Sequence, residues 1–179
     1  MTTLIVSATA IEAAYVPDGL PLLVTGVGKT AAAAHLSREL TRRPDVTRIV
    51  NIGSAGALHD HLEGLHVVGH VIHHDISAEA IRALGYEFED ELVLDPASPI
   101  RLATGDVFVT DPVVRSALAQ RADLVDMEGF ALAWTARLFG VDAVLVKHVS
   151  DNADESAMDW VTAVEHSARA LGSWLTEHV

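Results

Sequence analysis

The stretch Val144–Asp154, VLVKHVSDNAD, constrains the fold of this chain most strongly. It opens with apolar, mostly β-branched residues, which are typical of a strand buried on both faces. It then becomes polar, at Lys147, Ser150, Asp151 and Asp154. In open α/β sheets, ligands bind beyond the carboxyl ends of the strands, so Ser150 and Asp151 stand at a candidate site. The alternative is that both residues cap or solvate a loop, where Ser and Asp are common.

Around this stretch, apolar runs alternate with Ala-rich segments of helical period. Further strands are predicted at Thr3–Ala8, Leu20–Thr25, Arg48–Ile52, Leu65–Ile72, Arg101–Ala103 and Asp123–Met127, with the last strand at Val141–Val149. Helices are predicted at Lys29–Arg42, after Asp111 as N-cap with Pro112 behind it, at Glu128–Phe139 before Gly140, and over the apolar face of Val161, Val164, Ala168, Leu171 and Leu175. This alternation predicts an α/β sandwich with a largely parallel or mixed sheet, folded as one domain over residues 1–179. The segment Gly53–Gly56 is expected to follow the third strand, and Asp75–Pro99 shows no clear period.

Composition narrows the classes of function. The 25 acidic and 12 basic residues give a formal net charge of −13, which repels phosphate backbones and anionic lipid headgroups. Binding to nucleic acid or to a membrane surface is therefore not expected. Because the chain has no cysteine, disulfides, thiolate nucleophiles and Cys zinc sites are excluded. Its first residues lack the basic segment of a secretory signal, so a cytoplasmic location is expected.

Two glycine motifs imitate nucleotide-binding loops. The GKT at 28–30 resembles the end of a Walker A loop, but that motif needs a glycine at position 23, which is Leu. The segment GVGKTA at 26–31 resembles a dinucleotide fingerprint, yet no acidic residue closes a second βα unit at the required distance. No cofactor is expected. The turn still offers backbone N–H groups at a helix start, which an anion or a bound hydroxyl can approach.

Six of the ten histidines lie between His59 and His74, and His70-x-x-His73-His74-Asp75 contains residue types that bind metals. In a strand, His73 and His74 point to opposite faces, whereas His70 and His74 share one. A compact three-ligand site is not built into this spacing. We therefore predict structural or surface roles for these histidines and no metal.

Carboxylates follow several predicted strands at their carboxyl ends, namely Glu12, Asp126, Glu128 and Asp151. Each alone can be a helix-start acid that the helix dipole favours. Together they predict a cleft rim where burial and mutual repulsion raise one pKa enough to keep a proton at neutral pH. Such a group of acids is suited to hydrolysing a bond whose leaving group must be protonated.

Eight short motifs follow one another along nearly the whole chain. They are a strand into Ile11-Glu12, TGVGKTAAA at 25–33, NIGSAGAL at 51–58, VVGHVIHHD at 67–75, GYEFE at 85–89, TGDVFV at 104–109, VDMEG at 125–129 and KHVSDNAD at 147–154. In wording and order they resemble the 5′-methylthioadenosine/S-adenosylhomocysteine nucleosidases, within the purine nucleoside phosphorylase type 1 superfamily. The resemblance implies a three-layer α/β/α sandwich around a mixed, partly closed sheet of the nucleoside phosphorylase type.

The resemblance also implies catalytic roles. Asp151 would be the general acid that protonates N7 of the purine, with Ser150 orienting it. Glu12 would hold and activate the attacking water, helped by Ser54 and Lys147. In such a reaction nearby carboxylates stabilise an oxocarbenium-like sugar while a donor neutralises the departing base.

Substrate-binding roles follow in the same way. Glu128 would bind the ribose 2′- and 3′-hydroxyls, and Met127 would pack on the sugar. Phe108 would stack on the base, and the backbone of Val109 would read its edge.

The chain departs from the family in several places. It is considerably shorter than expected, with the stretch between Glu12 and Thr25 cut back and Asp90–Arg101 compressed, so a peripheral hairpin is expected to be missing. Lys147 stands where members usually carry Arg, which replaces a bidentate contact by a point charge. The 5′ substituent therefore stays open, among methylthioadenosine, S-adenosylhomocysteine, 5′-deoxyadenosine, a futalosine-like nucleoside and another purine nucleoside.

Two other functions stay open. Phosphorylases of this superfamily place arginines around the phosphate, whereas the segment after NIGSAG has no Arg before Arg82, which favours hydrolysis. A nucleoside-binding module without turnover would need the ribose contact but not Asp151 or Glu12. The family and the apolar, aromatic segment Leu84–Phe88 also lead us to expect a homodimer with the site near its interface.

Overall fold

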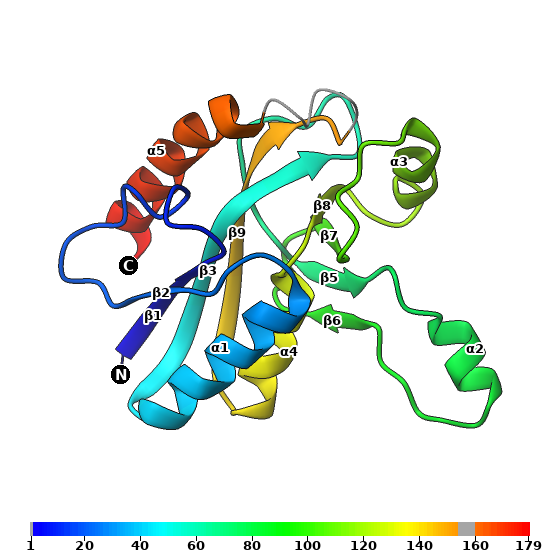
Figure 1. Ribbon diagram of the computed structural model, residues 1–179, viewed down its shortest axis with the longest axis horizontal. Helices are drawn as coiled ribbons and strands as arrows, with labels where there is room; N and C mark the ends of the chain where they lie inside the picture. The colour runs from blue at the N-terminus through cyan, green and yellow to red at the C-terminus, as the bar shows by residue number, and fades with distance from the viewer. Residues whose placement is uncertain (1, 154–159) are drawn as a thin grey trace.

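The computed structural model describes residues 2–153 and 160–179, and the side chains of 2–153 and 164–179. The strands are β1 (Thr2–Ser7), β2 (Leu22–Val24), β3 (Val46–Ala57), β4 (Leu65–Val67), β5 (His70–His73), β6 (Glu91–Val93), β7 (Arg101–Thr104), β8 (Leu124–Asp126) and β9 (Asp142–Asp151). The helices are α1 (Lys29–Arg42), α2 (Ala78–Ala83), α3 (Pro112–Leu118), α4 (Gly129–Leu138) and α5 (Trp160–His178). In Figure 1 the long strands β3 and β9 run side by side through the centre.

The sheet branches at β3. Along its first part this strand lies parallel to β1 on one side and to β9 on the other. At its end, Gly56 and Ala57 pair in the antiparallel direction with β8, and the sheet continues from β8 through β7 and β5 to β6. The remaining strands are β2, parallel to β1, and β4, antiparallel to β9. The sheet is therefore mixed, as predicted.

Alternating side chains of the strands bury against helices on both faces of the sheet. Leu4 and Val6 of β1 pack with α1 and α4, whereas Ile5 between them packs with Leu171 of α5. The same alternation in β9 sends Lys147 toward α4 and His148 toward α5, where its Nδ1 lies 2.9 Å from Ser167 Oγ. Two helical layers around a mixed sheet confirm the predicted three-layer α/β fold (Figure 1).

Several local predictions are confirmed. The helix at Lys29–Arg42 has the predicted bounds, and the Asp111 side chain caps α3 by accepting from the Val113 N–H at 2.7 Å. Gly140 follows α4 with φ +68°, a left-handed conformation that glycine adopts without steric cost. On α5, the predicted apolar residues Val164, Ala168, Leu171 and Leu175 are buried, and the side chain of Val161 lies outside the described residues.

Other local predictions are wrong. The strand predicted at Leu65–Ile72 is two strands, β4 and β5, because the chain changes partners between Val68, which donates to Leu145, and Gly69, which donates to Ile100. Gly69 permits this crossing, since a Cβ there would lie 2.0 Å from the Ser98 carbonyl oxygen. The segment Gly53–Gly56 lies inside β3 rather than after it.

The segment Asp75–Pro99, which showed no clear period, holds α2 and β6. Both are too short to display a period, and the pairing of β6 with β5 determines that it is a strand. Over residues 2–153 and 160–179, no helix is both long and apolar enough to cross a bilayer.

Candidate active site

A cavity of about 200 Å³ opens where the carboxyl ends of β1, β3, β8 and β9 meet. Eight of the nine residues predicted for the site line it, namely Glu12, Ser54, Phe108, Val109, Met127, Glu128, Ser150 and Asp151. The ninth, Lys147, is buried beneath it. The cavity has the size and position of a small-molecule site in an α/β protein.

A bulge in β9 brings Ser150 and Asp151 to the same side of the sheet. Ala55 of β3 pairs with Val149 and Gly56 with Asp151, so Ser150 is an extra residue in the ladder. Adjacent residues of a regular strand point to opposite faces, and a bulge re-aims one of them. Ser150 Oγ can therefore donate to Asp151 Oδ2 at 2.7 Å, while both side chains face the cavity. The sequence predicted that this strand ends at Val149, whereas β9 continues through Asp151 with a bulge.

Asp151 is fixed on its other side by backbone. Its Oδ1 accepts from the Ala153 N–H at 2.8 Å, and Ala153 adopts a positive φ of 50°. Gly56 makes room for this arrangement, because a Cβ there would lie 3.0 Å from Asp151 Oδ1 and 2.9 Å from the Ala153 Cβ. A glycine in the middle of β3 thus allows the carboxyl group to approach the neighbouring strand.

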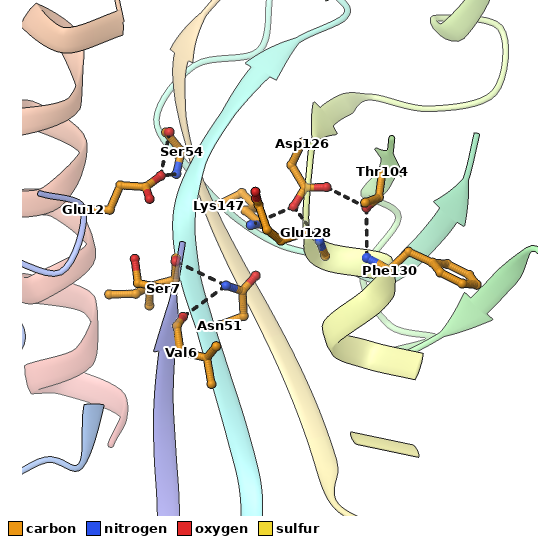
Figure 2. Close-up of polar contacts among 12 residues, drawn as sticks. Val6, Ser7, Glu12, Asn51, Ser54, Thr104, Asp126, Glu128, Phe130 and Lys147 are labelled. Atoms are coloured by element: carbon orange, nitrogen blue, oxygen red, sulfur yellow. Dashed lines mark hydrogen bonds and ion pairs between the residues drawn. The ribbon is translucent and has the colours of Figure 1, made fainter. Parts of the chain in front are cut away.

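Glu12 is a buried carboxylate held by three side-chain and backbone donors. Its Oε1 accepts from both the backbone N–H and the hydroxyl of Ser54 at 2.8 Å (Figure 2). Its Oε2 accepts from Thr9 Oγ1 at 2.8 Å. Thr9 in turn accepts from the Glu12 N–H at 3.2 Å. The side chain is held in one orientation at the cavity wall, with 4% of the residue exposed.

Lys147 is paired with Asp126 rather than aimed into the cavity. Its Nζ lies 2.9 Å from Asp126 Oδ2, and both side chains are almost fully buried (Figure 2). Burial by itself lowers the pKa of Lys147, but the carboxylates of Asp126 and Glu128 outweigh it and leave that pKa above its ordinary value. Lys147 is therefore a buried cation.

Asp126 also organises the start of α4. Its Oδ1 accepts from Thr104 Oγ1 at 2.6 Å, and its Oδ2 accepts from the Gly129 N–H at 2.8 Å. Thr104 Oγ1 accepts in turn from the Phe130 N–H at 2.9 Å. Sequence reasoning placed Asp126 among the rim acids but missed this network, because its partners come from β7 and β9, which lie far away along the chain.

Glu128 carries the most perturbed carboxyl group of the cavity. Burial, followed by repulsion from Asp126, raises its pKa to about 7, although Lys147 and the Gly28 N–H act in the opposite direction. Its Oε1 accepts from the Gly28 N–H at 2.7 Å. The site therefore holds a carboxyl group that changes charge near neutral pH.

The glycine turn before α1 binds carboxylates of the protein itself. Gly28 donates to Glu128, and the Lys29 N–H donates to Asp106 Oδ1 at 2.9 Å. The Lys29 ammonium forms an ion pair with Asp75 and lies 2.8 Å from His73 Nε2. The sequence suggested that an anion can approach this turn, and in the structure the anions are side chains.

The histidine cluster does not converge. His73 packs on Phe130 with ring centroids 5.0 Å apart, whereas His74 packs against Gly105. Among the described residues, no group of three or more His, Cys, Asp or Glu side chains is arranged to hold a metal ion.

Comparisons with known proteins identify the family. A model of the phosphorylase superfamily matches residues 89–177. The 5′-methylthioadenosine/S-adenosylhomocysteine nucleosidase of Geobacillus thermodenitrificans is 32% identical over 189 residues, covering 87% of this chain and 78% of the relative. The enzyme of the same name from Shewanella denitrificans is 30% identical over 188 residues, covering 86% of this chain and 79% of the relative. The chain belongs to the 5′-methylthioadenosine/S-adenosylhomocysteine nucleosidase family. It is therefore an N-glycosidase, a hydrolase.

Solved structures agree in fold with this nucleosidase family member. The nucleosidase of Helicobacter pylori superposes with a TM-score of 0.85 at 20% identity, covering 99% of this chain and 97% of that chain. Futalosine hydrolase of Helicobacter pylori superposes with a TM-score of 0.86 at 21% identity, covering 98% and 96%. These likenesses extend over nearly the whole chain.

The raised pKa of Glu128 predicts a pH-dependent cost to stability. Between its ordinary value of 4.5 and about 7, the folded protein holds a proton that the unfolded chain releases, so stability falls as pH rises through this window. Glu128→Gln removes the charge and keeps an oxygen that can accept from Gly28. Urea unfolding should find the variant more stable than the parent by up to about 3 kcal/mol at pH 8, and equal to it near pH 4.5. The exposed Glu177→Gln is the matched control and should show no such divergence; a constant offset for Glu128→Gln at both pH values would contradict the prediction.

Proposed function

We propose that the chain hydrolyses the N-glycosidic bond of purine nucleosides of the 5′-methylthioadenosine and S-adenosylhomocysteine type, releasing the free base and a ribose species. The observation that carries this proposal is the arrangement of Glu12, Glu128 and Asp151 around one cavity. A proton donor, a water-binding carboxylate and a ribose-binding carboxylate are the groups that such a hydrolysis requires.

Asp151 is the proposed general acid. As the bond to the base breaks, its carboxyl proton passes to N7 of the purine, so the base leaves without negative charge. Ser150 Oγ donates to Asp151 Oδ2, and the Ala153 N–H donates to Oδ1, so both oxygens are held in place. Ser150 is thus a positioning residue for the acid.

Glu12 is the proposed base for the attacking water. Both of its oxygens are oriented by Ser54 and Thr9, which fixes the carboxylate relative to a water in the cavity. Water adds to the sugar carbon that the base leaves, and Glu12 takes its proton. Lys147 contributes through the electric field, because its ammonium is bound to Asp126.

The substrate-binding roles fit the lining of the cavity. Glu128 accepts from the ribose 2′- and 3′-hydroxyls, and Met127 beside it packs on the sugar. Phe108 is 48% exposed and stacks on the base, while the buried Val109 offers its backbone to the edge of the base. Aromatic rings and a few fixed polar groups are the usual means of orienting a small ligand.

Hydrolysis is favoured over phosphorolysis by two observations. The described residues that line the cavity include four acids, Glu12, Asp126, Glu128 and Asp151, and no Lys, Arg or His. The helix-start N–H groups of the glycine turn, which can bind phosphate, already donate to Glu128 and Asp106. A phosphate ion would therefore meet repulsion from these acids, with no cationic side chain among the described lining residues to offset it.

The proposed substrate range is set by the 5′ substituent. The relatives are named for methylthioadenosine and S-adenosylhomocysteine, and a structural neighbour for futalosine. In this chain the exposed apolar residues Val27 and Val107 lie on the cavity wall, which suits an apolar 5′ group such as methylthio.

A product assay tests the proposal. The protein is incubated with 5′-methylthioadenosine, S-adenosylhomocysteine, 5′-deoxyadenosine, futalosine and inosine, with and without phosphate, and the sugar product is identified. We expect free methylthioribose from the first substrate in both conditions. Sugar 1-phosphate formed only with phosphate would identify a phosphorylase, and ligand binding without any product would identify a binding module.

The role of Glu12 is tested by Glu12→Gln. The amide oxygen can still accept from Ser54, and Thr9 can accept from the new amide, so the shape of the wall is preserved. Turnover should fall by about 10²-fold or more, the usual contribution of a positioned base, while adenine still binds. Wild-type kcat in this variant would mean that Glu12 has only a structural role.

The role of Asp151 is tested by Asp151→Asn, which keeps the oxygen that accepts from Ala153 but cannot give up a proton to the base. We expect kcat to fall by about 10²–10⁴ with a modest change in KM, because the lost interaction belongs mainly to the transition state. A nitrophenyl riboside, whose leaving group needs no protonation, should be affected much less. Equal loss of binding and turnover for both substrates would contradict the assignment.

We further propose a homodimer in which the partner covers the mouth of the cavity. The mouth is apolar, with Phe108, Val27 and Val107 each about half exposed. Leu84 and Tyr86 are still more exposed on the segment that follows α2, which would cover the cavity of the partner. Such surfaces mark contact sites in soluble proteins. Light scattering at micromolar concentration should give twice the chain mass, and Leu84→Glu should shift it toward the monomer and lower activity. A fully active monomer would contradict the proposal.

A further inference from the structure

The buried pair Asp126–Lys147 stands beside Glu128 and has no direct part in the reaction proposed above. We propose that these two residues are positioning residues that set the charge of Glu128, and with it the pH range in which the site accepts a ribose diol. This inference rests on the proposed function, in which Glu128 receives hydrogen bonds from the ribose hydroxyls. An ionised carboxylate accepts both hydroxyls, whereas a protonated one must itself donate through one oxygen.

The hydrogen bonds distinguish the two neighbouring carboxylates. Asp126 accepts from Thr104 Oγ1, from the Gly129 N–H and from Lys147 Nζ, at distances between 2.6 and 2.9 Å. Hydrogen-bond donors of this kind stabilise negative charge on a carboxylate. Glu128 accepts from the Gly28 N–H alone within the described residues. Glu128 thus has fewer donors to stabilise a negative charge than Asp126, whose contacts with Lys147 and Thr104 are drawn in Figure 2.

The charges that face Glu128 come from each element packed around it. Asp126 ends β8, Lys147 lies on β9, Glu12 follows β1, and the N–H of Gly28 begins α1. Asp151 lines the same cavity at the end of β9. Further from Glu128, the Lys29 ammonium forms ion pairs with Asp75 and Asp106, and the Asp106 N–H donates to Asp75.

The negative charges around Glu128 outnumber the positive one, and Lys147 is the cation that offsets them. Three carboxylates, Asp126, Glu12 and Asp151, repel a negative charge on Glu128, and a buried site screens that repulsion weakly. The ammonium of Lys147 is the cation among the groups that act on Glu128. Without the charge of Lys147, Glu128 would be protonated at neutral pH. Without the charge of Asp126, Glu128 would already be ionised at a lower pH.

The inference predicts shifts of opposite sign. The side-chain carboxyl of Glu128 is followed by ¹³C NMR through a pH titration in protein labelled at glutamate, with Glu128→Gln used to assign the signal. Lys147→Met should raise the midpoint by about one pH unit or more, and Asp126→Asn should lower it by a similar amount. The double variant Asp126→Asn/Lys147→Met removes both charges and should return the midpoint to within about half a unit of the parent.

Two controls separate charge from structure. Thr104→Val removes a hydrogen bond to Asp126 but no charge, so it should leave the midpoint in place even where it lowers turnover. Circular dichroism and thermal unfolding check that each variant is folded. If Asp126→Asn does not fold because Lys147 is left unpaired, the comparison of Lys147→Met with the double variant still tests the inference.

Kinetics give a second reading. With 5′-methylthioadenosine, kcat/KM falls at acid pH as Glu128 becomes protonated. The pH of this fall should be higher in Lys147→Met than in the parent, and close to the parent value in the double variant. The binding of adenine, which has no ribose, should not follow these movements. Shifts in the same direction for both charge variants, or none, would overturn the inference. The NMR titration needs no turnover. An inactive protein would therefore count against the proposed hydrolysis, while the inference about the charge of Glu128 could still be tested.

Discussion

The contact between Lys147 and Asp126 is the interaction on which the rest of the site depends. An ammonium placed in the centre of a sheet is tolerated only where a carboxylate and further hydrogen bonds compensate its desolvation. Asp126 meets this need and, through Thr104 and Gly129, ties β7, β8, β9 and the start of α4 to one point. The same pair lies under a cavity rich in acids, so it joins the stability of the core to the electrostatics of the site.

Two glycines of β3 allow charged side chains of the site to pack closely against this strand. A Cβ at Gly53 would lie 3.2 Å from Lys147 Nζ and 3.4 Å from Glu12 Oε1, and a Cβ at Gly56 would press on Asp151. Both glycines lie within β3, where the residue type usually weakens a strand. Here β3 pairs with strands on both sides, which compensates that weakness, and the missing side chains leave room for the acids. The segment Gly53–Gly56, which was expected to follow the third strand, is thus part of a strand adapted to its neighbours.

Much of the fold and the position of the site could be predicted from the sequence, because both depend on local signals. The glycine turn and Pro44 bound the helix at Lys29–Arg42, and carboxylates after predicted strands gather at one edge of an α/β sheet. What could not be predicted depends on pairing between distant segments. The bulge at Ser150 exists only because of its register with Ala55 and Gly56, and the partner of Lys147 comes from a strand more than twenty residues away in the chain. The partners of β6 and the break after Val67 have the same origin.

The cluster of acids lowers the stability of the fold and provides the charged groups of the candidate site. Burial makes the carboxylate of Glu128 costly to ionise, and repulsion from Asp126, two residues away, adds to that cost. A core optimised for stability alone would replace them with apolar residues, as replacements of buried ion pairs in other proteins show. The structure instead retains them around one cavity and gives each its own donors: Ser54 and Thr9 for Glu12, Ser150 and the Ala153 N–H for Asp151, and a single backbone N–H for Glu128. Among these three carboxylates Glu128 has the fewest donors, and in the proposed reaction the hydroxyls of a bound ribose would supply the hydrogen bonds that the protein does not.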